Sequence, residues 1–211
     1  MSRMKFSFSV CLIVAATWLP SSANASGGTS MAHLHAGESS QAPIGWTQFC
    51  RDNPTDCRIP RSAETVKRLD ERSWRELLAV NLQFNKAIAP VTDQEQYGVF
   101  ENWTYAATGK GDCEDYVLEK RRDLIRRGWP MSALLATVVI DKEGGGHVVL
   151  TAVTDRGEFI LDNQTDDVLP WSRSGLTFIR RQSAEDQNVW RFLGRVVGRP
   201  EVLTATAASN R

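Results

Sequence analysis

Residues 111–116 (GDCEDY) place the thiol of Cys113 among the carboxylates of Asp112, Glu114 and Asp115, at the predicted start of a helix. A helix N-terminus stabilises a thiolate, because its unpaired N–H groups and its dipole favour negative charge. The neighbouring carboxylates oppose the same ionisation, because like charges raise the pKa of the thiol. The motif therefore predicts a reactive cysteine and leaves open what offsets its acids.

A reactive thiol needs a base, and the chain has three histidines. His33 and His35 lie in a stretch rich in Gly, Ser and Ala, which is typical of a flexible segment. His147 instead opens a predicted strand and follows three glycines, which allow close approach of backbone or substrate. We therefore expect His147 to be the partner of Cys113.

A third group is needed to orient the imidazole of His147, and Asp162 is the candidate. Strands are predicted at 147–154 and 158–163, joined by a tight turn. Side chains alternate along a strand, so half of the possible hairpin registers put Asp162 on the face of His147. In two of these registers the two side chains are directly opposite or diagonal, which is within reach. The competing carboxylates fall in predicted turns: Asp155, Asp166 and Asp167.

The order Cys113, His147, Asp162 suits acyl transfer through a thiol. His147 would take the thiol proton, and Asp162 would fix the tautomer and stabilise the imidazolium. An oxyanion hole would need the Cys113 backbone N–H and a second donor. The indole of Trp103 is one candidate for this donor, although a buried core tryptophan is the commoner case.

Residues 1–25 have the pattern of a cleavable secretory signal. Arg3 and Lys5 precede an apolar run, and Ala23-Asn24-Ala25 supplies the small residues of a cleavage site. No later segment is apolar enough to span a membrane. We therefore expect a periplasmic or secreted protein.

The chain has 25 basic and 25 acidic residues. This charge balance gives no indication of nucleic-acid binding.

Export to an oxidising compartment favours disulfides, and three cysteines remain beyond the signal. Cys50 and Cys57 bracket a short turn-rich loop and are expected to form one disulfide. A metal site with His33 and His35 is the alternative. Cys113 is then left as the free thiol, which again favours reactivity.

The chain is expected to form one domain. We predict a flexible leader at 26–41, a domain at 42–202 and a frayed tail at 203–211. Helical spacing covers 62–89, with a break near Asp70, and again 112–127. Residues 92–110 are expected to connect the helices.

The elements that follow the second helix are strand-like. Strands are expected near 133–140, 147–154, 158–163, 176–181 and 189–197. On the predicted helix at 112–127, Lys120 is expected to face solvent. Asn81 and Asn85 are expected to be buried amides that tie the preceding helix to a nearby loop. Helices followed by an antiparallel meander predict an α+β fold.

The segments GDCEDYVLEKRRDLIRRG, GHVVLTAVTDRGEFILDNQ and LPW resemble the bacterial transglutaminase-like cysteine peptidases, which include the LapG-type periplasmic proteases. The resemblance runs from about residue 43 to 194. It implies a papain-like fold, with a helix bearing the cysteine packed on an antiparallel sheet. It also places the family triad on Cys113, His147 and Asp162, and it implies a membrane receptor as regulator.

The same resemblance implies calcium held by Asp112, Glu114 and Asp115. Ca²⁺ prefers hard oxygen ligands, and its charge would offset the acids around Cys113. The alternative is that these acids only cap the helix. One departure is the short stretch between Trp103 and Gly111, which indicates different substrate contacts.

The sequence thus favours an exported cysteine endopeptidase acting on a protein substrate, with a surface or envelope protein as one candidate. The same triad would serve a transglutaminase-type acyl transferase or a cell-wall peptide amidase. A non-catalytic binding or regulatory protein that retains the fold is a third interpretation.

Overall fold

The computed structural model describes residues 33–60 and 64–194. Within them, the helices are α1 (Ile44–Asp52), α2 (Glu71–Ala87), α3 (Asp93–Tyr97) and α4 (Cys113–Arg126). The strands are β1 (Ala36–Ser40), β2 (Ala89–Pro90), β3 (Lys110–Gly111), β4 (Leu134–Ile140), β5 (Gly146–Thr154), β6 (Gly157–Leu161), β7 (Leu169–Pro170), β8 (Thr177–Gln182) and β9 (Trp190–Leu193). The predicted signal at 1–25 and the predicted tail at 203–211 lie outside the described residues.

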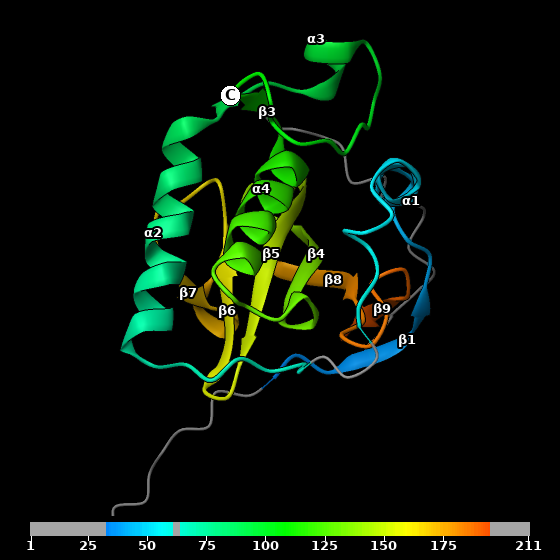
Figure 1. Cartoon of the computed structure of the whole chain (residues 1–211). Helices are drawn as coiled ribbons and strands as arrows, with labels where there is room; N and C mark the ends of the chain where they lie inside the picture. The colour runs from blue at the N-terminus through cyan, green and yellow to red at the C-terminus, as the bar shows by residue number, and fades with distance from the viewer. Residues whose placement is uncertain (1–32, 61–63, 195–211) are drawn as a thin grey trace, which may run out of the picture.

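A seven-stranded sheet in the order β1-β9-β8-β4-β5-β6-β7 carries the helices α2 and α4 on one face (Figure 1). Every neighbouring pair in this sheet is antiparallel. The fold is therefore α+β, with the helix that begins at Cys113 packed on the sheet, as the sequence predicts. None of the helices in the described part of the chain is long and apolar enough to cross a membrane.

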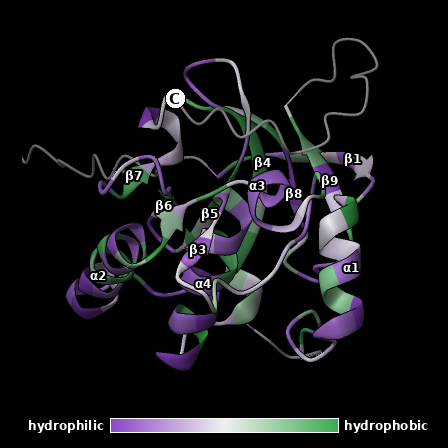
Figure 2. Cartoon of the chain, turned by 90° about the horizontal axis from the view of Figure 1, so that it is seen from above, coloured by the Kyte–Doolittle hydropathy of each residue, from purple (hydrophilic) through white to green (hydrophobic). Residues whose placement is uncertain are grey.

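The core lies between α4 and the central strands. Val117, Leu118 and Leu124 of α4 are buried in one cluster with Val138, Val148 and other residues of the sheet. Viewed from above, apolar colouring follows β4 and β5, while the outer helices carry polar residues (Figure 2). Burial of this apolar surface stabilises the packing of the helix on the sheet. It thereby fixes the N-terminus of α4 above β5.

Three local expectations are wrong. Residues 36–40, within the predicted leader, form β1 and pair with β9, because backbone pairing at a sheet edge does not need apolar side chains. Residues 64–70 are not helical, since Lys67 pairs with the β5 strand end. The predicted connection at 92–110 contains α3, and its end, β3, pairs with β2.

The start of α2 has a clear local cause. Asp70 accepts a hydrogen bond from the Ser73 backbone N–H, and the Ser73 hydroxyl accepts one from the Asp70 N–H, both at 2.8 Å. This reciprocal cap satisfies two N–H groups that a helix end leaves unpaired. The break that the sequence predicts near Asp70 is therefore the N-terminus of a single helix, α2.

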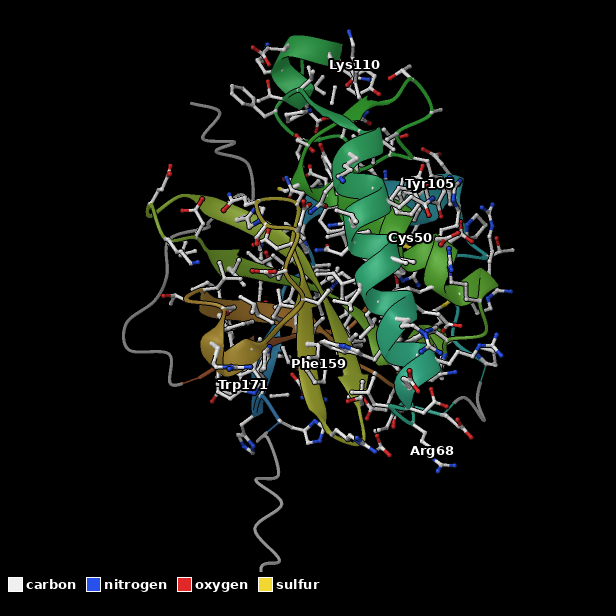
Figure 3. All side chains as sticks on the ribbon, turned by 90° about the vertical axis from the view of Figure 1, so that its left-hand side faces the viewer. Cys50, Arg68, Tyr105, Lys110, Phe159 and Trp171 are labelled. Atoms are coloured by element: carbon white, nitrogen blue, oxygen red, sulfur yellow. A yellow bond between two sulfur atoms is a disulfide. The ribbon has the colours of Figure 1, made fainter. Side chains whose placement is uncertain are left out.

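Cys50 and Cys57 form the predicted disulfide, and Cys113 is the free cysteine of the described chain. The disulfide takes up both cysteines of the alternative metal site, and His33 contacts Glu158 through a 3.3 Å hydrogen bond. Figure 3 shows Cys50 and Tyr105 on the same side of the molecule. The disulfide joins Cys50 of α1 to Cys57 in the loop that follows this helix. Cys57 belongs to the core cluster, and Cys50 packs against it.

We expect the double variant Cys50→Ser/Cys57→Ser to lose about 2 kcal/mol of unfolding free energy, because the bridge spans only 7 residues. Urea denaturation of the oxidised parent and of the variant measures this difference. Reactivity of Cys113 should be unchanged in the folded variant. A loss below about 0.5 kcal/mol would show that the loop is held mainly by packing.

Candidate active site

Cys113 is the first residue of α4 and is partly exposed. Its thiol donates a hydrogen bond to Glu114 Oε2 at 3.1 Å. The backbone N–H of Val148 on β5 donates toward the sulfur, which favours the thiolate. Because Val148 follows His147 directly, this contact places the thiol beside the strand that carries the histidine.

The surroundings of Cys113 keep its thiol protonated. Desolvation raises the pKa well above its ordinary value, and the charges of Glu114 and Asp112 raise it further. The hydrogen bond from Val148 acts in the opposite direction and is smaller. A positive charge near these two carboxylates would therefore favour the thiolate.

His147 and Asp162 form a buried pair, with His147 Nε2 and Asp162 Oδ1 separated by 2.8 Å. The β5–β6 hairpin pairs Leu150 with Leu161 and Thr154 with Gly157. This register puts Asp162 diagonally across from His147, one of the arrangements expected from side-chain alternation. Among the described residues, His147 Nδ1 has no hydrogen-bond partner and is the ring nitrogen left for a thiol.

Asp162 is held as a carboxylate. Burial raises its pKa, but the hydrogen bond and charge of His147, together with the Gln164 N–H and the charge of Lys120, give a net lowering of the pKa. The backbone N–H of Gln164 also donates to Asp162 Oδ1, at 3.0 Å. Gln164 Nε2 in turn donates to Asp141 Oδ2 at 3.1 Å, which joins this loop to the β4–β5 turn. The carboxylate that orients His147 is therefore fixed from two sides.

A second cluster lies at the N-terminal end of α4, where α3 and β3 also lie (Figure 1). One carboxylate oxygen from each of Asp93, Asp112 and Glu114 lies within 4.8 Å of the others, and all three residues are buried. Asp112 Oδ1 and Glu114 Oε1 have no hydrogen-bond partner. Buried polar atoms are normally satisfied, so these two oxygens are available to bind a ligand.

The charges of this cluster are unbalanced. Burial, followed by repulsion between neighbouring carboxylates, raises the pKa of Asp112 to about 6 and that of Glu114 well above its usual range. Burial also raises the pKa of Asp93. No lysine or arginine of the described residues forms an ion pair with any of the three. Hard oxygen donors that are buried together in this way suit a divalent ion such as Ca²⁺.

The structure does not bring all the predicted site residues together. Asp115 lies outside the three-carboxylate group, and its Oδ1 accepts the Thr104 N–H at 2.9 Å. The indole N–H of Trp103 donates to Glu101 Oε1 at 3.0 Å, and its ring packs against Trp46 and Trp190 in the core. Trp103 is therefore a core residue, and its N–H is not available as an oxyanion donor.

Sequence reasoning missed Asp93 and misplaced Lys120. Asp93 lies nineteen residues before Asp112, in a segment predicted to be a connection, and no ligand motif marks it. In the structure its backbone N–H donates to Asp112 Oδ2 at 3.2 Å. Lys120 was expected in solvent, but only 1% of it is exposed. Its Nζ instead donates to Asn81 Oδ1 at 2.8 Å.

The structure has a cysteine at a helix N-terminus and a histidine–aspartate pair on the adjoining hairpin, an arrangement that could serve a thiol-dependent hydrolase. A family model described as bacterial transglutaminase-like cysteine proteinase matches residues 36–196. The chain belongs to this family, and it is a cysteine peptidase. Membership implies a protein substrate. No curated protein matches the chain.

Solved structures of Legionella pneumophila LapG share the fold. The calcium-bound form has a TM-score of 0.50 and 22% identity, over 74% of this chain and 84% of that one. An EGTA-treated form has a TM-score of 0.48 and 21% identity, over 72% and 77%. The match to the calcium-bound form agrees with the α+β architecture that the sequence predicts.

Proposed function

We propose that this protein is an exported endopeptidase that cleaves a protein substrate with a triad of Cys113, His147 and Asp162. The observation that carries the proposal is the 2.8 Å contact between His147 Nε2 and Asp162 Oδ1 on the hairpin whose Val148 contacts the Cys113 thiol. Membership in a proteinase family supports this assignment of roles.

In the proposed reaction, His147 Nδ1 takes the proton of Cys113, and the sulfur attacks the carbonyl carbon of the scissile peptide bond. The imidazolium, stabilised by Asp162, gives its proton to the leaving amine as the C–N bond breaks. Water, deprotonated by His147, then attacks the thioester and releases the acid product and the thiol. The backbone N–H of Cys113 has no partner within the helix and is suited to bind the oxyanion.

We also propose that Asp93, Asp112 and Glu114 hold a calcium ion. The unpartnered oxygens of Asp112 and Glu114 support this ligand set, in which Asp93 replaces the Asp115 of the sequence-based hypothesis. Calcium bound there would supply positive charge beside Cys113 and offset the acids that keep its thiol protonated. A membrane receptor that regulates the enzyme stays a prediction from the family resemblance.

A comparison of protein termini in the native cell envelope tests the proteolytic function. Cells with the wild-type protein should contain new N-termini that are absent from cells with Cys113→Ala. Isopeptide crosslinks without new termini would indicate acyl transfer instead, and cleaved cell-wall peptides would indicate an amidase. No difference in any of these products, with both proteins present at equal amounts, would favour a non-catalytic role. Fractionation of the same cells tests the predicted periplasmic or secreted location.

A further inference from the structure

Lys120 is a buried cation beside the proposed triad, and the mechanism above does not use it. It lies seven residues after Cys113 on α4, so the two residues share one face of the helix. Its side chain is 1% exposed, and its Nζ lies 5.7 Å from the centre of the Tyr116 ring. No carboxylate of the described residues forms a salt bridge with it. A buried ammonium without an ion-pair partner is costly, so a structural role alone explains it poorly.

The hydrogen bonds of Lys120 lead to the loop that carries Asp162. Lys120 Nζ donates to Asn81 Oδ1, and Asn81 Nδ2 donates to the carbonyl oxygens of Thr165 at 3.0 Å and Asp166 at 3.1 Å. The ammonium thus orients the amide of Asn81, because it requires the oxygen on its own side and leaves the NH₂ group for the loop. The loop after β6 is held through this amide.

Asn85, one helical turn after Asn81, continues the same contact. Its Nδ2 donates to the carbonyl oxygens of Asp162 at 3.0 Å and Thr165 at 2.9 Å. Two amides of α2 therefore bind the backbone of 162–166, and one of them is fixed by Lys120. The carboxylate of Asp162, at the start of the same segment, contacts His147 Nε2 at 2.8 Å.

Charge couples Lys120 to the same aspartate. Burial lowers the pKa of Lys120 to about 7, while the negative charges of Asp162 and Asp166 raise it. Lys120 in turn is one of the groups that lower the pKa of Asp162. The interaction is mutual, so each group must shift the other by the same free energy.

We propose that Lys120 is a positioning residue for the triad: its ammonium group balances the Asp162 carboxylate and, through Asn81, fixes the loop that aims this carboxylate at His147. The inference rests on the proposed function, because it assigns Lys120 a part in the orientation of His147. Nothing in the sequence pattern marks Lys120 for this role, since its neighbours Arg122 and Arg126 have the same charge.

The coupling is measured without catalysis by NMR titration of the calcium-loaded protein labelled with ¹³C at lysine side chains. One lysine, identified by its absence in Lys120→Met, should titrate near pH 7, well below an ordinary lysine near 10.4. In Asp162→Asn this midpoint should fall further, because a negative neighbour has been removed. The matched control is Asp167→Asn, an exposed residue of the same loop, which should leave the midpoint unchanged. An equal midpoint in wild type and Asp162→Asn would overturn the proposal.

Kinetics with a protein substrate from the envelope comparison supply the second readout. Lys120→Met should lower kcat by about 10- to 100-fold, as is typical when a group that orients a reacting residue is removed, with little change in KM. Lys86→Met, at an exposed lysine of α2, is the control and should retain full kcat. Unchanged kcat in folded Lys120→Met would contradict a positioning role. Full activity of Cys113→Ala would instead contradict the triad itself, whatever the NMR result.

Discussion

Replacing His147 with alanine is expected to lower kcat for proteolysis on the order of 10⁴-fold or more, which is typical when the base of a nucleophile–base pair is lost. Without the imidazole, Cys113 has no group to take its proton, and burial, together with the charges of Glu114 and Asp112, raises the pKa of its thiol. The leaving amine also loses its proton donor. Turnover of a substrate from the envelope comparison, measured at saturating substrate, gives this effect directly.

The control for this variant is His35→Ala, at an exposed histidine outside the proposed site. It should retain the wild-type kcat. A His147→Ala enzyme with more than about a tenth of wild-type kcat would show that another group acts as the base, since general bases contribute about 10²–10⁴-fold. Asp162→Asn should give a smaller loss than His147→Ala, because the aspartate acts only through the histidine.

Removal of calcium is expected to slow alkylation of Cys113 by iodoacetamide at pH 7 by at least about tenfold. The reason is electrostatic, because the thiolate is the reacting form and a divalent ion beside it offsets Asp112 and Glu114. The same step should lower the melting temperature, since a ligand that binds only the folded state stabilises it, by about 2.7 kcal/mol at a hundredfold excess over Kd. Mass spectrometry of the alkylated peptide and thermal unfolding with and without chelator measure both.

The variant Asp93→Asn distinguishes the loss of calcium at this site from other effects of the chelator. The variant keeps an oxygen that can accept the Asn102 N–H but removes one negative charge from the cluster. Calcium titrations should show an affinity weakened by about tenfold or more, because the number of charged ligands tunes calcium affinity. Glu71→Gln, at an exposed carboxylate on α2, is the matched control. Equal alkylation rates with calcium and with chelator would refute calcium activation of Cys113.

Local patterns predicted most of the sheet because its strands are encoded by runs of apolar residues. The expected strands near 133–140, 147–154 and 158–163 correspond to β4, β5 and β6, and the hairpin of the last two adopts one of the registers that the sequence left open. The short pieces β2, β3 and β7 have two residues each and carry no periodicity that a sequence pattern could reveal. Strand β1 was missed for a related reason, since its AGESS sequence resembles a linker and only pairing with β9 makes it a strand.

The sequence by itself predicted which groups could react. Cys113 follows from its helix start, His147 from being the remaining histidine, and Asp162 from the alternation of side chains along a hairpin. These three inferences use only local geometry and the chemistry of the residue types, and they left open which hairpin register the chain adopts. The register that joins His147 to Asp162 is itself local, because a short turn connects their strands.

Only the tertiary structure decided what surrounds these groups. Asp93 reaches Asp112 because α3 folds back over the start of α4, and no spacing rule predicts such a contact between irregular segments. Lys120 was placed in solvent because burial of an isolated charge is unfavourable, and this rule fails only where a partner from another element is present. Here the partner is Asn81 of α2, with the charge of Asp162 beyond it. The sequence thus predicts the thiol, the base and the aspartate that orients the base, while long-range packing sets the charges around them.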